Sequence, residues 1–217
     1  MHLSSVNIGT KRDQQNGHEN ETTGIYKTSS TGRVQISAIG IEQDFIGDQK
    51  NHGGPDQAIY VYGTPDYDWW TRELGKELEP GTFGENLTVS DLESARLNIG
   101  DRLRIGTVTL EVTAPRIPCS TLAARMGDPK FAKKYRHADR PGVYCRVVQS
   151  GSVHAGEAVE LLPYAGETVS ALEMFREHFT ADKDEVTLRR ILRAPISLRA
   201  RAELGRELRK VLLGREA

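Results

Sequence analysis

Short apolar runs of period two, separated by glycine-containing turns, recur over the first 162 residues and restrict this chain to folds built on a sheet. In residues 107–113, Val108, Leu110 and Val112 alternate with polar residues, as in a half-buried strand. Comparable runs occupy residues 3–8, 34–39, 58–62, 142–149 and 158–162. The polar residues 9–23 lack apolar periodicity and are predicted to form a mobile loop. Many short strands with one or two helices between them predict a mainly β fold with helices (α+β), arranged as a closed or nearly closed β-barrel.

Helical patterns appear between two of these strands and again at the end of the chain. Thr64 and Pro65 are suited to begin a helix that Gly75 would end, and the pair Trp69-Trp70 within it is predicted to be core. After Pro163, three amphipathic patterns follow, which are too short to bury much surface by themselves, so we expect them to pack on the barrel or on a second subunit. We therefore divide the chain into a barrel domain, residues 1–163, and a three-helix domain, residues 164–217.

Composition argues against several classes of function. The chain of 217 residues has a net charge of −1, so no basic field predicts binding to nucleic acid or to a membrane surface. No stretch approaches the roughly 18 apolar residues that span a bilayer, and no export signal is recognisable. The two cysteines, Cys119 and Cys145, fit neither a disulfide framework nor a paired zinc site. These features predict a cytoplasmic protein.

Cys119 lies where a strand is predicted to pass into a helix. Pro115 and Pro118 stiffen the turn between them. A helix N-terminus after Cys119 and the charge of Arg116 would both favour a thiolate, which is a nucleophile and a soft metal ligand. An ordinary half-buried loop cysteine is an equally open interpretation, and Cys145, which alternates with apolar neighbours in its strand, is predicted to be a packing residue.

Three polar, glycine-containing loops are candidates for ligand binding. Lys27 lies in a hydroxyl-rich turn that could bind phosphate or could simply be solvated. His52 precedes a pair of glycines whose backbone could approach a ligand, and the alternative is a surface turn. Asn86 ends the third loop, where its side chain could bond its own backbone or a ligand.

Together these loops and the cysteine segment resemble the MOSC domain, named after the C-terminal domain of molybdenum cofactor sulfurases, and specifically its bacterial YiiM-type members. The resemblance spans about residues 20 to 162, and the helices after it are similar to the three-helix domain of those proteins. The matching positions are Lys27-Thr28, Gly40-Ile41-Glu42, Asp44, Asp48, His52-Gly53-Gly54-Pro55-Asp56, Ala58, Pro80-Gly81, Phe83-Gly84-Glu85-Asn86-Leu87, Ile99-Gly100-Asp101, Pro115-Arg116, Pro118-Cys119, Tyr144 and Arg146-Val147. The chain departs from the family at Gln43, where a glycine is usual.

The resemblance implies a β-barrel that binds the molybdenum cofactor (molybdopterin, Mo), with Cys119 as metal ligand and catalytic residue. A thiolate suits such a metal, which the pterin dithiolene also holds. Pyridoxal phosphate is not expected. The cofactor-binding residues that the resemblance and the loop chemistry suggest are Lys27, Thr28, His52, Gly53, Gly54, Phe83, Gly84, Glu85, Asn86 and Arg116.

The resemblance also implies an oxidoreductase that reduces N–OH groups. Similar proteins reduce small N-hydroxylated substrates, such as N-hydroxylated purine bases, in detoxification. Because the chain has no flavin or nicotinamide fingerprint, we expect a separate flavin-containing reductase as electron donor. The appended helices are compatible with a homodimer. Two alternatives stay open: a carrier of persulfide sulfur on Cys119, linked to molybdenum cofactor or metal–sulfur cluster assembly, and a non-catalytic barrel that binds an anion or a partner.

Overall fold

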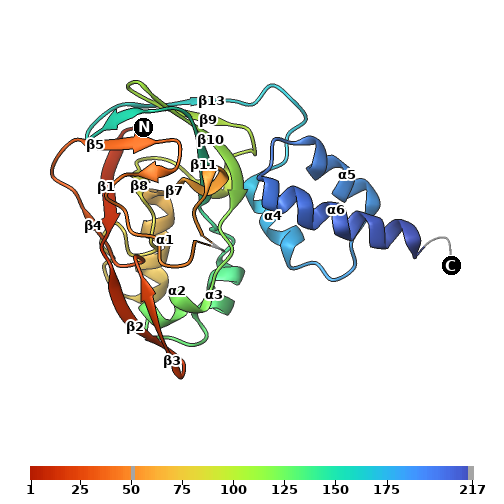
Figure 1. Ribbon diagram of the computed structural model, residues 1–217, viewed down its shortest axis with the longest axis horizontal. Helices are drawn as coiled ribbons and strands as arrows, with labels where there is room; N and C mark the ends of the chain where they lie inside the picture. Colours follow the sequence, from red (N-terminus) through yellow and green to blue (C-terminus); the bar gives the residue numbers. More distant parts are fainter. Residues whose placement is uncertain (50–51, 215–217) are drawn as a thin grey trace.

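An eight-stranded mixed sheet forms the body of the protein in the computed structural model, which describes residues 1–49 and 52–214 (Figure 1). The strand order is β13-β9-β10-β11-β7-β8-β1-β4, and all neighbours are antiparallel except β7 and β8. Its strands are β1 (Leu3–Gly9), β4 (Lys27–Ser29), β7 (Ile59–Gly63), β8 (Leu87–Val89), β9 (Arg102–Ile105), β10 (Val108–Pro115), β11 (Val143–Gln149) and β13 (Val159–Leu162). The α+β class is confirmed.

The expected closed barrel is wrong, because the sheet has two edges, at β13 and at β4. Strands that could have completed a ring pair elsewhere: β12 (Gly151–Val153), β5 (Val34–Ser37) and β6 (Gly40–Ile41) form a separate three-stranded sheet. An isolated bridge between His2 and Ala158, flanked by backbone hydrogen bonds of Leu3, Gly156 and Val159, joins the start of β1 to the start of β13 but does not close the sheet. The body is therefore a strongly curved, open sheet.

The strand that leads to the cysteine segment is more deeply buried than its alternation suggests. Val108, Leu110 and Val112 are fully buried, as predicted. On the other face, Glu111 is also buried, because its carboxylate pairs with Arg102 and Arg146. Buried carboxylates need such partners, so this strand is covered on both faces.

The polar segment predicted as a mobile loop at residues 9–23 instead forms a hairpin, β2 (Arg12–Asn16) and β3 (Glu19–Thr23). Gly17 takes a positive φ of 63° in the tight turn, which a glycine allows without strain. Gly17 and His18 form the two-residue turn, and a glycine at its first position is a turn signal that the lack of apolar alternation hid. The hairpin is hydrogen-bonded to the start of α2: Gln14 donates to the Thr121 carbonyl, Asn16 donates to the Ser120 hydroxyl, and the Thr121 hydroxyl donates to Glu21.

Helices cover one face of the sheet and extend from its end. The helices of the body are α1 (Thr64–Leu74), α2 (Ser120–Arg125) and α3 (Phe131–Ala138), with short 3-10 turns η1 (Pro55–Gln57) and η2 (Ser94–Arg96). Gly75 ends α1 in the left-handed conformation, as predicted. An aromatic cluster that includes Trp70, Phe83 and Tyr135 fills the space between these helices and the sheet, so the Trp pair is partly core, as expected.

Three helices follow β13 and dock beside β10 and β11 (Figure 1). They are α4 (Ala171–His178), α5 (Glu185–Arg193) and α6 (Leu198–Leu213). The segment before α6 joins the sheet: the Ser197 amide donates to the Thr113 carbonyl, and the Leu198 amide donates to Asp56 Oδ2 at 2.7 Å. The three predicted helices are confirmed, while the division at residue 163 stays a prediction. No helix in the described ranges is long and apolar enough to cross a membrane.

Candidate functional site

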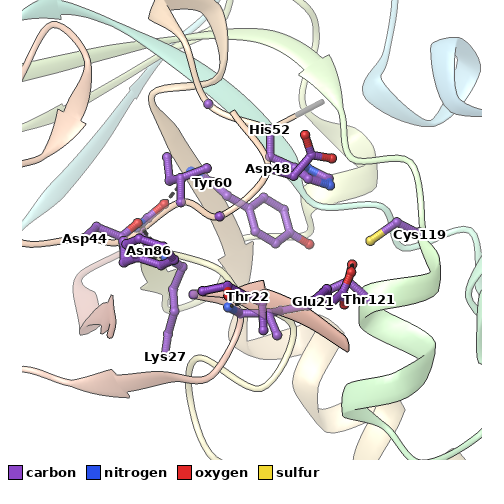
Figure 2. A pocket seen from close by; sticks show the side chains of 18 of the residues that line it. Glu21, Thr22, Lys27, Asp44, Asp48, His52, Tyr60, Asn86, Cys119 and Thr121 are labelled. Atoms are coloured by element: carbon purple, nitrogen blue, oxygen red, sulfur yellow. Dashed lines mark hydrogen bonds and ion pairs between the residues drawn. The ribbon is translucent and has the colours of Figure 1, made fainter. Parts of the chain in front are cut away.

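Two adjoining cavities meet at Cys119. The smaller one, about 100 Å³, runs from the Cys119 sulfur past Tyr60 to a polar group formed by Lys27, Asp44 and Asn86 (Figure 2). The larger one, about 710 Å³, lies between the Cys119 loop and the helices α4, α5 and α6. Cys119, His52 and four other residues border both cavities: Glu21, Asp48, Thr121 and Tyr144. The cysteine is thus accessible from two sides.

Cys119 is the residue before the first turn of α2, with φ −125° and ψ 170°, so the predicted helix start after the cysteine is confirmed, although Ser120 and Thr121 lie inside the helix and do not cap it. Burial alone would raise the pKa of its thiol, but a hydrogen bond from His52, the charge of Arg116 and the backbone N–H of Leu122 together lower the pKa to about 6. The thiol is therefore largely a thiolate at neutral pH. This supports the interpretation of a reactive cysteine over that of an ordinary loop cysteine.

Arg116 brings a charge into the interior beside the cysteine. Its side chain is 3% exposed and lies over the ring of Tyr60, with Cζ 5.3 Å from the ring centroid. Although burial opposes the charge, the Cys119 thiolate and the surrounding tyrosines raise the pKa of Arg116, so it stays protonated. Its Nη1 is buried and donates to no described residue. Because a buried guanidinium N–H without an acceptor is costly, this atom is suited to bind an anion in the smaller cavity.

Lys27 borders the smaller cavity but already has a partner. Its ammonium lies 2.5 Å from both carboxylate oxygens of Asp44, and both side chains are almost fully buried. Asn86 Nδ2 donates to the same carboxylate at 2.9 Å, while its Oδ1 accepts from the backbone of Tyr60. Burial lowers the pKa of Lys27 although Asp44 opposes this shift. The positive charge expected to meet a phosphate is therefore compensated within the protein.

The structure brings most, but not all, of the predicted site residues together. Those on the wall of the smaller cavity are Lys27, His52, Gly53, Gly84, Asn86, Arg116 and Cys119. Thr28, Gly54, Phe83 and Glu85 line neither cavity. Phe83 is in the aromatic core, and Glu85 is fully buried, where it accepts from Tyr67 and from the Gly81 backbone. A Cβ at Gly84 would meet Ile25 at 2.9 Å, so that glycine also serves packing.

Several wall residues escaped the sequence prediction. Tyr60 and Tyr144 line the smaller cavity and flank Arg116 and His52; the Tyr144 hydroxyl lies 3.3 Å from His52 Nδ1. Glu21 lies in β3 of the hairpin, and its carboxylate accepts a hydrogen bond from the Thr121 hydroxyl. Tyr144 is one of the positions that carry the family resemblance, but both tyrosines alternate within apolar strand patterns and were not assigned to the site. The hairpin was predicted as a loop, so Glu21 carried no site signal.

No group of three or more His, Cys, Asp or Glu side chains in residues 1–49 and 52–214 is arranged to hold a metal ion. A metal at this site would therefore need ligands from its own cofactor beside the Cys119 thiolate. A dithiolene-bearing, anionic pterin meets that requirement, because it supplies sulfur ligands and an anion for the unpartnered Arg116 N–H. The residues present fit the molybdenum cofactor.

Fold and site together define an α+β protein with a thiolate-forming cysteine and a buried arginine at a cavity between a curved sheet and a helical appendage. The chain belongs to the MOSC domain family, whose model matches residues 48–160. It is 32% identical over 188 residues to the protein YflK of Bacillus subtilis (strain 168), covering 87% of this chain and 85% of that protein. It is 29% identical over 171 residues to the protein YiiM of Escherichia coli (strain K12), covering 77% of this chain and 76% of that protein.

A third relative and a solved structure are also similar to this chain. A protein of Gibberella moniliformis (strain M3125 / FGSC 7600) named "Reductase" is 34% identical over 152 residues, which are 66% of this chain and 26% of that protein. The crystal structure of YiiM from Geobacillus stearothermophilus superposes with a TM-score of 0.79 at 24% identity, covering 95% of this chain and 98% of that one. The predicted resemblance to YiiM-type MOSC proteins is confirmed.

Proposed function

We propose that this protein is a molybdenum cofactor-dependent reductase of N-hydroxylated compounds, N-hydroxylated purine bases among them, with Cys119 as the protein ligand to molybdenum. One observation carries the proposal: a cysteine whose pKa is lowered to about 6 lies at the junction of two cavities, next to a buried Arg116 N–H without an acceptor. Membership of the MOSC family and the relative named "Reductase" support an oxidoreductase.

The two cavities have separate roles in this proposal. Arg116 and the backbone of Gly53 would hold the anionic cofactor from the smaller cavity, and Cys119 would be the protein ligand to its metal. The N-hydroxylated substrate enters the larger cavity, which reaches the same sulfur. Bound cofactor supplies an electron pair to cleave the N–O bond. Two electrons and two protons are consumed, and the products are the N–H compound and water.

Proton delivery is the step for which the chain itself offers groups. His52 donates to the Cys119 thiolate and lies 3.3 Å from the Tyr144 hydroxyl, and both border the two cavities. This pair can pass protons toward the leaving oxygen while it orients the cysteine. The electrons come from a separate flavin-containing reductase. A homodimer and residence in the cytoplasm stay predictions.

The test measures N–OH reduction by protein produced in a host that makes the cofactor, with dithionite-reduced dye as electron source, so that the natural donor is not needed. Parent, Cys119→Ser and the control Cys145→Ser are assayed for molybdenum, for pterin and for conversion of an N-hydroxylated purine. The proposal expects conversion by the parent and the control only. Stoichiometric molybdenum with full conversion in Cys119→Ser would refute it.

The second candidate is a sulfur carrier with a persulfide on Cys119. The lowered pKa and the access from the larger cavity favour it equally, because a carrier cysteine must be both a thiolate and exposed to its donor. Mass spectrometry of the isolated protein distinguishes the two candidates. A mass increase of one sulfur atom on Cys119, without molybdenum or pterin, would favour the carrier.

A further inference from the structure

One short loop connects the histidine beside Cys119 to the junction between the body and the C-terminal helices. It begins at His52, which donates a hydrogen bond to the Cys119 thiolate, and it ends in η1, where Asp56 lies. Gly53 and Gly54 between them have φ angles of 84° and 83°, in the left-handed region that favours glycine. The path from His52 to Asp56 is therefore short and of defined shape, so a displacement of Asp56 would also displace His52.

Asp56 contacts three elements at once. Its carbonyl oxygen accepts from the Thr113 hydroxyl of β10 at 2.6 Å. Its carboxylate forms an ion pair with Arg146 of β11 at 3.0 Å, and Oδ2 of the same carboxylate accepts from the Leu198 amide of α6 at 2.7 Å. These contacts fix Asp56 between the sheet and the C-terminal helices.

The carboxylate of Asp56 completes the N-terminus of α6. Ser197 caps the helix by accepting from the Ala200 amide, but the amide of Leu198, the first helical residue, needs an acceptor from outside the helix. Asp56 is that acceptor. The first turn of α6 has Arg199 and no acidic residue, although negative charge is favourable at this end of a helix. The body therefore supplies the anion that the helix itself lacks.

Arg146 binds the same junction from the sheet. Its Nη2 donates to the carbonyl oxygens of Pro195 and Ile196, both at 3.2 Å, in the segment that leads into α6. Its Nη1 lies 3.5 Å from the carboxylate of Glu111 in β10. Asp56 and Arg146 both match the family pattern, although neither borders the smaller or the larger cavity. A role that acts on the site from outside its cavities explains why they belong to the pattern.

A second route leads from the junction to the same histidine. The Ser197 amide donates to the Thr113 carbonyl at 3.1 Å, next to the start of α6. The Thr113 hydroxyl lies 3.0 Å from the Tyr144 carbonyl, and the Tyr144 hydroxyl lies 3.3 Å from His52 Nδ1. Both routes begin where α6 docks and end at His52, so the place of the imidazole depends on that docking.

We propose that Asp56 is a positioning residue: it ties the N-terminus of α6 to the His52 loop, so that docking of the C-terminal helices holds His52 against Cys119. The helical appendage thereby supports the site from outside. The consequence for catalysis rests on the proposed function, because a fixed His52 keeps the cysteine ready to bind the metal. The link itself is a property of the chain and can be measured without molybdenum.

The first test removes the link from the helix side and measures alkylation of Cys119 by iodoacetamide at pH 6 in cofactor-free protein. Leu198→Pro deletes the amide that donates to Asp56. Proline suits the first position of a helix, the Leu198 side chain is exposed, and Ser197, at φ −58° and ψ 149°, already has the extended backbone that precedes a proline. We expect alkylation to slow about two- to threefold because His52 is held less firmly. Leu198→Ala, which keeps the amide, is the matched control and should leave the rate unchanged.

The second test removes the link from the body side. Asp56→Ala loses both the acceptor and the ion pair, and it should slow alkylation about two- to fivefold, no more than His52→Gln does. Asp56→Asn keeps an oxygen that accepts from the Leu198 amide and should restore most of the rate. Glu111→Ala removes the other carboxylate that pairs with Arg146 but lies outside the His52 loop, so it is the control and should leave the rate nearly unchanged.

A double-mutant cycle tests whether the effect passes through His52. In the His52→Gln background, Asp56→Ala should slow alkylation no further, because the group that Asp56 positions is gone. Additive losses in the cycle, or a parental rate in both Asp56→Ala and Leu198→Pro, would overturn the inference. So would faster alkylation, which would mean that the variants merely uncover the sulfur. Circular dichroism checks that each variant is folded.

The two proposals fail separately. The alkylation rates come from protein without molybdenum, so a missing link would leave the reductase proposal standing. Conversely, the expected rates in a protein that never binds molybdenum, in a host that makes the cofactor, would sustain the role of Asp56 and refute the reductase.

Discussion

Cys119 and Cys145 lie close together in the topology and have opposite surroundings. Cys145 is in β11, paired with Val112 of β10, and Cys119 follows the end of β10. Cys145 is fully buried among apolar side chains, and burial raises its pKa far above the ordinary value. Cys119 is partly exposed, and its polar neighbours lower its pKa to about 6.

The difference shows that reactivity here is set by the side chains around the sulfur. Burial acts against the thiolate at both positions. Only at Cys119 do a hydrogen bond from His52 and the charge of Arg116 outweigh it. The turn that exposes Cys119 also places it beside these donors, whereas Cys145 lies in the apolar core, where no such donor lowers its pKa. The two cysteines are therefore internal controls for each other.

The largest expected effect is on the proposed reaction. Cys119→Ser should reduce N–OH reduction to background, a loss on the order of a thousandfold or more, because the metal loses its protein ligand. Cys145→Ser, matched in chemistry, should leave turnover per bound molybdenum unchanged. Steady-state rates normalised to molybdenum content measure both. Equal losses in the two variants would mean that folding, and not the site, had been disturbed.

In the cofactor-free native protein, the rate constant of alkylation at pH 7 should be at least about a hundredfold larger for Cys119 than for Cys145, because only Cys119 is both accessible and ionised. The rate at Cys119 should rise through pH 6 and level off above about pH 7, whereas a free cysteine rises through about pH 8.5. Peptide mass spectrometry after timed quenching locates the label. A midpoint near 8.5 at Cys119 would contradict the account of its environment.

His52→Gln should move the alkylation midpoint of Cys119 upward by about one pH unit, since removal of the hydrogen bond and charge of His52 disfavours the thiolate. The rate should then fall several-fold at pH 6 and stay nearly unchanged at pH 9. His178→Gln, at the far wall of the larger cavity, is the control and should leave the midpoint in place. If both variants behave alike, His52 does not activate the cysteine.

The smallest effect is on stability, where the variant at Cys145 is expected to lose more than the variant at Cys119. Cys145→Ser should lower the free energy of unfolding by about 1–3 kcal/mol, because a hydroxyl replaces a buried thiol among apolar side chains. Cys119→Ser should change it by less than about 0.5 kcal/mol at pH 5.5. At that pH, below its pKa of about 6, Cys119 is mostly neutral in the native state. Urea denaturation of cofactor-free protein measures both, and a larger loss for Cys119→Ser would break the comparison.

Local chemistry near Cys119 was predictable from the sequence because its signals are local. The alternation up to Val112, the prolines Pro115 and Pro118 and the helical pattern after the cysteine predict a strand, a stiff turn and a helix start, and the structure has all of them. The role of Cys145 as a packing residue was equally predictable, since the alternation in β11 places it with apolar neighbours. Both features depend on residues within a few positions of the cysteine.

Long-range partners explain what the sequence could not indicate. Asp44 neutralises Lys27 across the cavity, and nothing near Lys27 in the chain announces this pairing. Closure of the sheet depends on where β5 and β12 pair, which their short apolar patterns leave open. The hairpin at residues 12–23 lacks apolar alternation because its polar residues bond to one another and to α2. The larger cavity forms only where the C-terminal helices dock on the body, so no local sequence pattern could predict it.

X-ray absorption at the molybdenum edge tests the central claim most directly. Parent, Cys145→Ser and Cys119→Ser are produced in a host that makes the cofactor, and any molybdenum retained is measured with its sulfur neighbours. The account predicts that the parent and Cys145→Ser have one sulfur ligand more than the dithiolene provides, and that Cys119→Ser either loses the metal or loses that one sulfur. The same number of sulfur ligands in all three proteins, at equal molybdenum content, would contradict it.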